Sequence, residues 1–175
     1  MKAVAKVESS TRGAFQDYLG KKVPTILFER HYFRNFTGGK YNKSHQLISG
    51  PYDPSKYGKY SAQYPKLLEA MGLNEDAGLK SCSWGKFQIM GANFKNCGHA
   101  NVKEMITDAF TSEKEQLKQF VNFVIYDKNL LSAIQGKKWD NFARGYNGPR
   151  YADNKYDVKM KEAYDFFVNN TGSLP

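Results

Sequence analysis

The first apolar positions of the chain lie on one side of a short helix that stops early. Ala3, Val4 and Val7 fall at i, i+1 and i+4, the spacing of one helical face. Residues 9–13 then read SSTRG, a run that interrupts a helix rather than extending it. Glu8 therefore lies where an apolar helix ends and a turn begins. A lone glutamate at such a place is by default a solvated residue, but the position also suits a carboxyl group held at the edge of a cleft.

The next segments predict a small amount of β-structure followed by a long loop. Residues 13–18 and 23–29 read as two strands around LGKK, which together predict a β-hairpin. Residues 30–36 return to a helical pattern. Residues 37–59 are rich in Gly, Pro, Ser and Asn and predict a loop that carries three tyrosines. Loops of this length are uncommon in compact domains unless they bind something.

Beyond the loop, the apolar positions mostly follow a helical period. The expected helices cover residues 64–71 with a stop at Gly72, a segment capped by Asn74 that ends near Ser81, a longer segment that begins at Ser112, and residues 154–167. Ser112 precedes Glu115 by three positions, which is the signature of a capping box. Apolar stripes along these helices predict core packing. The expected fold class is a mainly helical α+β domain with a small N-terminal hairpin.

Length and composition limit the organisation of the chain. Its 175 residues are 41% hydrophobic and 15% aromatic, which suits one compact domain with a proper core. The longest apolar run, near residues 120–126, is broken by Asn122 and is far shorter than a membrane span. The N-terminus lacks the apolar region of a Sec signal peptide. We therefore expect synthesis in the cytoplasm and export by another route.

Net charge points to a class of partner. Lys and Arg number 26 against 17 Asp and Glu, which gives a net charge of +9. Such a chain is attracted to polyanions, which include nucleic acid, acidic membranes and an anionic bacterial envelope. The lysines are scattered along the chain, so charge does not choose among these partners.

The cysteines and histidines do not predict a metal site or a disulfide framework. Cys82, Cys97 and His99 lack the paired spacing of zinc ligands. We expect both cysteines to be buried structural thiols, and we expect no metal and no cofactor.

Glu29 is a second candidate for acid–base chemistry. It ends the apolar stretch of LFERH, residues 27–31. The alternative is that Glu29 is an ion-pair partner of Arg30 or Arg34.

Two later segments combine glycines, aromatic rings and an amide. They are SWGKFQIMGANF (83–94), which contains Ser83 and Gln88, and ARGYNGP (143–149), which contains Tyr146 and Asn147. Glycines let backbone approach a ligand closely, and an amide among apolar neighbours suits hydrogen bonding to a hydroxylated or amidated substrate. The aromatic residues of these segments could equally be core residues.

Four segments in this order resemble the N-acetylmuramidase catalytic domain of phage endolysins. They are VESSTRGAF, LFERHYFRNFT, SWGKFQIMG with NFKNCG, and FARGYNGPRYADNKYD, and the resemblance runs from about Val4 to Tyr164. The pattern is also similar to goose-type lysozymes and soluble lytic transglycosylases. In those families a helix ends in Glu-Ser, a Gly-x-x-Gln-Ile/Val-Met segment follows, and a Tyr-Asn pair comes near the end. The resemblance implies one lysozyme-like domain over residues 1–175.

The resemblance also implies an activity and roles for particular residues. The expected reaction is hydrolysis of the β-1,4 bond between N-acetylmuramic acid and N-acetylglucosamine in peptidoglycan. Glu8 of the Glu-Ser pair would be the general acid, and Glu29 would be the second carboxylate, with Asp17 less favoured. The residues expected to line the sugar sites are Ser83, Gln88, Tyr146 and Asn147.

The biological setting follows from the same resemblance. The chain would be a monomeric phage endolysin, made in the host cytoplasm and acting on the cell wall in the periplasm at lysis. Family members often carry a small wall-binding module, which we do not expect here. Attraction to the wall would then depend on the +9 charge of the catalytic domain.

Two other functions remain open from the sequence. A lytic transglycosylase would form 1,6-anhydromuramic ends and needs no carboxylate to activate water, so Glu29 favours the hydrolase. A non-catalytic nucleic-acid-binding protein would explain the charge and the aromatic residues. However, the chain contains no RNA-recognition signature and no helix-turn-helix pattern.

Overall fold

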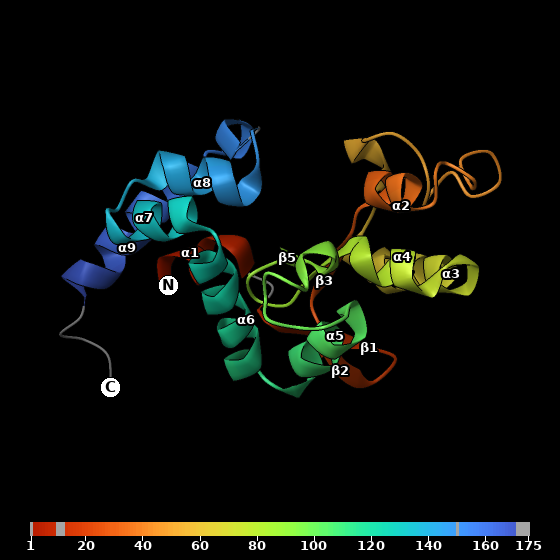
Figure 1. Cartoon of the computed structure of the whole chain (residues 1–175), viewed down its shortest axis with the longest axis horizontal. Coiled ribbons are helices and arrows are strands. Elements are labelled where there is room, and N and C mark those ends of the chain that lie inside the picture. Colours follow the sequence, from red (N-terminus) through yellow and green to blue (C-terminus); the bar gives the residue numbers. More distant parts are fainter. Residues whose placement is uncertain (1, 10–12, 150, 171–175) are drawn as a thin grey trace.

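The computed structural model describes residues 2–9, 13–149 and 151–170. Its elements in chain order are α1 (Lys2–Ser9), β1 (Phe15–Tyr18), β2 (Lys21–Pro24), β3 (Ile26–Phe28), α2 (Arg30–Phe36), η1 (Pro54–Lys56), η2 (Tyr60–Ala62), α3 (Gln63–Leu73), α4 (Glu75–Lys80), β4 (Cys82–Trp84), β5 (Ile89–Met90), η3 (Gly91–Asn93), α5 (Val102–Thr111), α6 (Glu113–Tyr126), α7 (Lys128–Gln135), α8 (Trp139–Asn147), η4 (Tyr151–Asn154) and α9 (Tyr156–Asn169). The predicted α+β class, mainly helical with an N-terminal hairpin, is confirmed (Figure 1). The turn predicted after Glu8 falls largely on residues 10–12, outside the described residues.

The predicted hairpin is correct, but its second strand is shorter than expected. β1 pairs antiparallel with β2, so that Tyr18 lies opposite Lys21. Leu19 and Gly20 form the turn with positive φ values of 50° and 76°, which is typical of tight two-residue hairpins. The chain leaves the hairpin at Thr25, and β3 pairs with β4 in a separate three-stranded sheet. Glu29 therefore follows a strand of this second sheet and not the hairpin.

Local capping signals place two helices correctly. The Asn74 side chain accepts a hydrogen bond from the Ala77 N–H, and the Ser112 hydroxyl accepts one from the Glu115 N–H. The predicted stop at Gly72 is wrong, because α3 continues to Leu73 before Asn74 ends it. The last helix begins at Tyr156, two residues later than predicted. The sequence did not delimit α5, α7 or α8.

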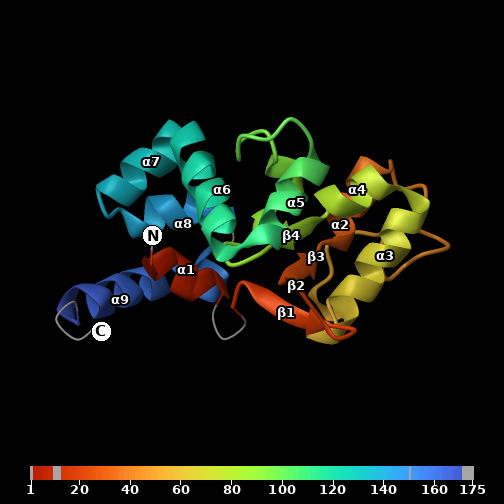
Figure 2. The same ribbon diagram turned by 90° about the horizontal axis from the view of Figure 1, so that it is seen from below.

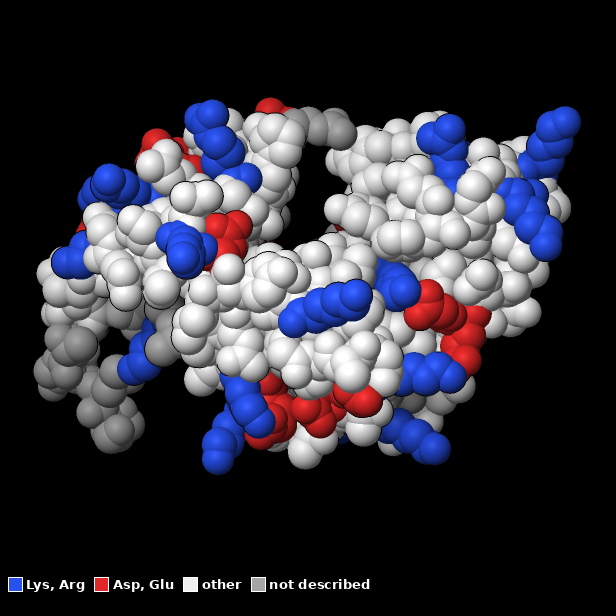
Figure 3. Space-filling view, viewed as in Figure 1, with Lys and Arg blue, Asp and Glu red and all other residues white. Residues whose placement is uncertain are grey.

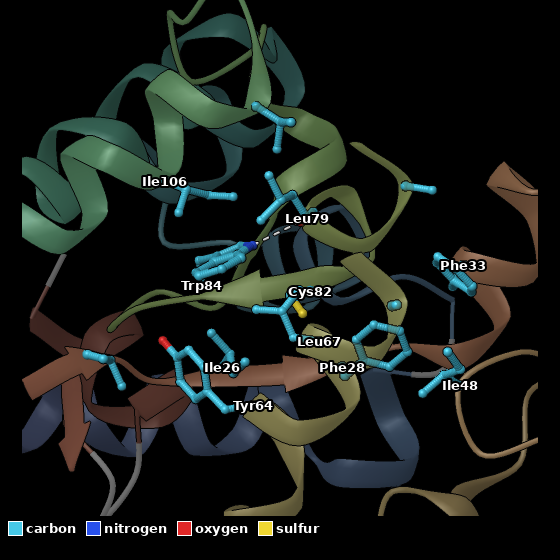
Figure 4. Packing of buried hydrophobic residues seen from close by; sticks show 14 residues of the cluster. Ile26, Phe28, Phe33, Ile48, Tyr64, Leu67, Leu79, Cys82, Trp84 and Ile106 are labelled. Atoms are coloured by element: carbon cyan, nitrogen blue, oxygen red, sulfur yellow. Dashed lines mark hydrogen bonds between the residues drawn. The ribbon is translucent and has the colours of Figure 1, made fainter. Parts of the chain in front are cut away.

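Two hydrophobic cores divide the molecule into two lobes. The sheet lobe comprises β3, β4 and α2–α4, and its core includes Phe28, Phe33, Leu67 and Trp84 (Figure 4). The helical lobe comprises α1 and α6–α9, and its core contains Val4, Phe120, Phe142 and Met160. α1 packs against α9, so the first and last helices lie side by side (Figures 1 and 2).

The β4–β5 hairpin and α5 connect the two lobes. Trp84 belongs to the core of the sheet lobe, whereas Phe87 and Ile89, which follow it, belong to the core of the helical lobe. In α5, Ile106 belongs to the core of the sheet lobe and Met105 to the core of the helical lobe. On one face a deep hollow with mostly uncharged walls separates the lobes (Figure 3). α8 and α2 lie on its two sides (Figure 1).

The two cysteines are buried free thiols, as the sequence predicted. Cys82 lies in the core of the sheet lobe beside Phe28 and Leu67 (Figure 4), and Cys97 lies in the core of the helical lobe. Burial raises the pKa of the Cys97 thiol to about 12. Both cysteines are therefore packing residues. Among the described residues, no helix is both long and apolar enough to cross a membrane.

Candidate active site

Glu8 lies near the end of α1 and contacts α8. The Asn147 side-chain amide donates a hydrogen bond to Glu8 Oε1 over 2.7 Å. Burial raises the pKa of Glu8 from its ordinary value of 4.5 to about 7, although the hydrogen bond from Asn147 lowers it. Glu8 therefore holds its proton at a higher pH than an ordinary glutamate does. A partly accessible carboxyl in this state is able to act as a general acid.

The apolar face of α1 explains why Glu8 is placed in this way. Val4 and Ala5 are buried in the core of the helical lobe, and Val7 packs against that core. Because these side chains hold α1 against the lobe, Glu8 at the end of the helix is drawn into a largely apolar environment. This burial is the condition that raises a carboxyl pKa.

Tyr146 and Phe142 set the position of Asn147. Tyr146 stacks on Phe142 with ring centroids 5.4 Å apart, and its hydroxyl donates to the Phe87 carbonyl over 2.6 Å. Gly148, with a φ of 81°, then ends α8 directly after Asn147. Tyr146 thus acts as a packing residue that fixes the end of α8, and Asn147 is the residue that reaches Glu8.

Ser83 and Gln88 lie together but use their polar groups inside the protein. The Ser83 hydroxyl donates to Gln88 Oε1 over 2.8 Å, and Gln88 Nε2 donates to the Gly85 carbonyl over 2.8 Å and to the Thr25 carbonyl over 3.3 Å. Gln88 has a positive φ of 49°, a conformation that the side-chain bonds help to hold. The pair fixes the turn between β4 and β5 and ties it to the end of the N-terminal hairpin.

Glu29 lies in the sheet lobe, between β3 and α2, apart from the contact between Glu8 and Asn147. The Tyr57 hydroxyl donates to Glu29 Oε2 over 2.5 Å, and His31 Nδ1 lies 3.3 Å from the same oxygen. The side chain is only 15% exposed, and burial raises the pKa of Glu29 although the bond from Tyr57 lowers it. The buried carboxyl is therefore oriented by two neighbours.

Glu29 does not form the ion pair with Arg30 or Arg34 that was the alternative from the sequence. Among the described residues, the one Lys, Arg or His side chain with a nitrogen within 4.0 Å of the Glu29 carboxylate is His31. Arg30 instead donates to backbone carbonyls of the loop that follows α2.

Asp17, the less favoured candidate, is exposed on the hairpin. Its carboxylate lies 3.9 Å from Lys22 Nζ, and both side chains are 76% exposed. Such a carboxylate is surrounded by water and lacks the orientation that Glu29 has.

Sequence reasoning missed Tyr57 and His31 as partners of Glu29. The signal available was the long loop with its three tyrosines, which predicted binding without saying to what. Within the described part of the chain, no group of His, Cys, Asp and Glu residues is arranged to hold a metal ion.

Comparison with known proteins identifies the family of this chain. A family model described as N-acetylmuramidase matches residues 1–168. The crystal structure of a Burkholderia AP3 phage endolysin is similar, with a TM-score of 0.80 and 35% sequence identity over 97% of this chain. This chain spans 65% of that endolysin's chain. No curated protein matches the sequence. The chain belongs to the N-acetylmuramidase family, as the order of its four segments predicted.

Proposed function

We propose that this protein hydrolyses the β-1,4 bond between N-acetylmuramic acid and N-acetylglucosamine in peptidoglycan, with Glu8 as the general acid. The observation that carries the proposal is the Glu8 carboxyl, whose pKa is raised to about 7 by burial and which Asn147 orients. Family membership and the likeness to a phage endolysin support peptidoglycan as the substrate. The same likeness supports a role in lysis of a bacterial host.

Glycoside cleavage explains why the state of Glu8 matters. The leaving oxygen of a glycosidic bond is a poor leaving group until it is protonated, so the acid must still hold its proton at the working pH. Burial against an apolar wall is the usual way to achieve this, and lysozyme is a known example of the effect. A carboxyl with an ordinary pKa of 4.5 would have lost its proton almost completely at pH 7.

Glu29 is the proposed second carboxylate. Hydrolysis needs a group that activates water or stabilises the oxocarbenium-like transition state. α2, which begins directly after Glu29, and α8, which ends at Asn147, lie on opposite sides of the hollow (Figures 1 and 3). A glycan strand that occupied the hollow would pass between the two lobes that carry the glutamates.

The other expected site residues take different parts in this proposal. Asn147 orients the acid, because its amide already bonds the Glu8 carboxyl. Ser83, Gln88 and Tyr146 shape the wall of the site, because their polar groups pair within the protein.

Digestion of purified peptidoglycan tests the proposal. The wild-type protein should release fragments with reducing N-acetylmuramic acid ends, identified by mass spectrometry. Glu8→Gln should stay folded and lose about 10²-fold or more of the activity, the usual scale for loss of a general acid. Glu69→Gln, which removes the same charge from an exposed position on α3, should keep wild-type activity.

Three results would contradict the proposal. Anhydromuramic ends would identify a lytic transglycosylase. A folded and active Glu8→Gln variant would move the general acid elsewhere. A wild-type protein that leaves peptidoglycan intact would reject wall cleavage altogether.

A further inference from the structure

The long loop after α2 is held in place by side chains of α2 and α3. Arg30 donates from Nη1 to the Pro51 carbonyl over 3.0 Å and from Nη2 to the Ser49 carbonyl over 3.1 Å. It also donates to the carbonyl of Gln46. A Cβ at Gly50 would overlap the Arg30 guanidinium, so the loop approaches Arg30 as closely as only glycine allows. One arginine thus binds three successive parts of the loop.

α3 holds the last part of the same loop. Lys66, which is only 8% exposed, donates to the carbonyls of Lys56 and Tyr57 over 2.5 and 2.7 Å. Desolvation lowers the pKa of Lys66. A lysine at this degree of burial is expected only where its charge is well paired with acceptors.

Gln63 connects this loop directly to the strand that precedes Glu29. Its Nε2 donates to the Tyr57 carbonyl over 2.8 Å, and its Oε1 accepts a hydrogen bond from the Phe28 N–H over 3.0 Å. Gln63 is 1% exposed. The Gln63 amide belongs to α3 and bonds the backbone at both Tyr57 and Phe28. α3 therefore sets the distance between Tyr57 and Glu29.

The result of these contacts is a carboxyl group with one anchored oxygen. Tyr57 and His31 both contact Glu29 Oε2. Among the described residues, none donates a hydrogen bond to Oε1. Rings of this loop and of α2 surround Glu29, among them Tyr52, whose ring meets that of His31 edge-on at 5.4 Å.

We propose that Tyr57 is a positioning residue for Glu29. The anchored loop places the Tyr57 hydroxyl against Glu29 Oε2 and so directs Oε1 toward the substrate. This inference rests on the proposed role of Glu29 as the second carboxylate. A hydrogen bond from a phenol to an ionised carboxylate is short and favours the charged form. Tyr57 therefore orients Glu29 and opposes the rise in its pKa that burial causes.

Other charged and titratable groups surround Glu29 and must stay unchanged in a test. They are Arg30 and His31 of α2, Tyr52, Asp53 and Lys56 of the loop, Lys66 of α3, and Cys82 of β4. A change confined to the Tyr57 hydroxyl keeps all of these side chains, although it also removes the hydrogen bond between Tyr57 and Tyr52.

The test compares Tyr57→Phe with Tyr41→Phe and Glu29→Gln in the full chain. Tyr41→Phe is the matched control, because it removes a hydroxyl of the same loop that donates to the Leu73 carbonyl instead of a carboxylate. Activity on a soluble glycan oligomer is measured against pH, and the glutamate carboxyl signals are followed by ¹³C NMR. The carboxyl signal that is absent from the spectrum of Glu29→Gln is assigned to Glu29. Thermal melting confirms that each variant is folded.

Tyr57→Phe should lower kcat about tenfold with little change in KM, the scale of one lost hydrogen bond to a charged group. The acidic limb of the pH profile and the Glu29 titration should both move up by about one pH unit, since ionised Glu29 loses its donor. The alkaline limb, which reports Glu8, should not move. Tyr41→Phe should lower the melting temperature slightly and change neither titration.

Two results would overturn the inference, and they are distinguishable. If Glu29→Gln is inactive but Tyr57→Phe leaves the Glu29 titration and the acidic limb unchanged, the positioning role of Tyr57 is wrong and the function stands. If Glu29→Gln keeps full activity, Glu29 is not the second carboxylate and Tyr57 positions nothing catalytic.

The NMR titration reports on Tyr57 even if the wild-type protein does not cleave peptidoglycan. An unchanged Glu29 titration would then reject the contact itself.

Discussion

Glu8 and Asn147 contact each other although 139 positions separate them in the chain. The surroundings of Glu8 act on its pKa in opposite directions. Burial at the junction of α1 and α8 favours the protonated form of Glu8, whereas the amide of Asn147 favours the ionised form. Burial prevails, and the pKa of Glu8 lies near the pH at which a general acid is most useful. The two residues therefore form one functional unit.

This burial should make the protein less stable as pH rises. Between 4.5 and about 7, folded Glu8 retains a proton that the unfolded chain has released, so the free energy of unfolding falls across this range. The difference corresponds to about 3 kcal/mol, and burial of Glu29 acts in the same direction. Glu8→Gln, which has no charge to bury, should melt roughly 5–10 °C above the wild type at pH 8.

Melting curves recorded from pH 4 to pH 9 check this expectation. Glu69→Gln should keep the wild-type dependence on pH, because its carboxyl is exposed. Parallel curves for the wild type and Glu8→Gln would show that Glu8 titrates normally, which would remove the physical basis for its role as the acid.

At the scale of elements, the turn between β4 and β5 depends on a buried glutamine from α6. Gln116 Oε1 accepts a hydrogen bond from the Lys86 N–H over 2.7 Å, and its Nε2 donates to the Ala109 carbonyl over 2.9 Å. Gly85 lies against this amide with a φ of 67°, and a Cβ there would overlap Gln116. The turn that carries Gln88 is thus anchored by an element outside its own sheet.

Gly85→Ala should therefore destabilise the protein more than its backbone conformation alone requires. Gly20→Ala is the matched control, because Gly20 has a similar φ of 76° and no atom within 4 Å of the added Cβ. The control should cost about 1 kcal/mol for the left-handed backbone. Gly85→Ala should cost roughly 2 kcal/mol more, because the displaced amide leaves buried groups without partners. Equal losses in urea unfolding would mean that Gln116 adjusts freely.

At the scale of the whole molecule, positive charge is spread around the hollow rather than gathered in it on the face that Figure 3 shows. Lys and Arg side chains are spread over both lobes on the face that Figure 3 shows, whereas the walls of the hollow are mostly uncharged. The net charge of +9 should therefore attract the molecule to an anionic wall without choosing the bond that is cut.

Salt should weaken the binding of the protein to the wall without weakening cleavage of the glycan. Exposed charges are screened over about 8 Å at physiological ionic strength and about 3 Å at 1 M. Binding to purified walls should weaken strongly over this range, measured by co-sedimentation, while cleavage of a short uncharged glycan should change little. Wall binding that is unaffected by salt would show that attraction depends on the cleft alone.

Several features of this protein follow from short stretches of its sequence. Asn74 and Ser112 cap the helices that they were predicted to begin, and the hairpin turn forms at Leu19 and Gly20. The order of four motif segments was enough to predict the family. These features were predictable because caps, turns and helical faces depend on residues within about four positions of one another.

The tertiary structure alone decided how the candidate site is assembled. It separated β3 from the hairpin, paired it with β4, and so moved Glu29 into the sheet lobe. It placed Asn147 against Glu8 and Tyr57 against Glu29. The raised pKa of each glutamate comes mainly from burial by segments distant in the chain. The sequence determined which residues carry carboxyl groups, and long-range packing determined which of those groups have a raised pKa.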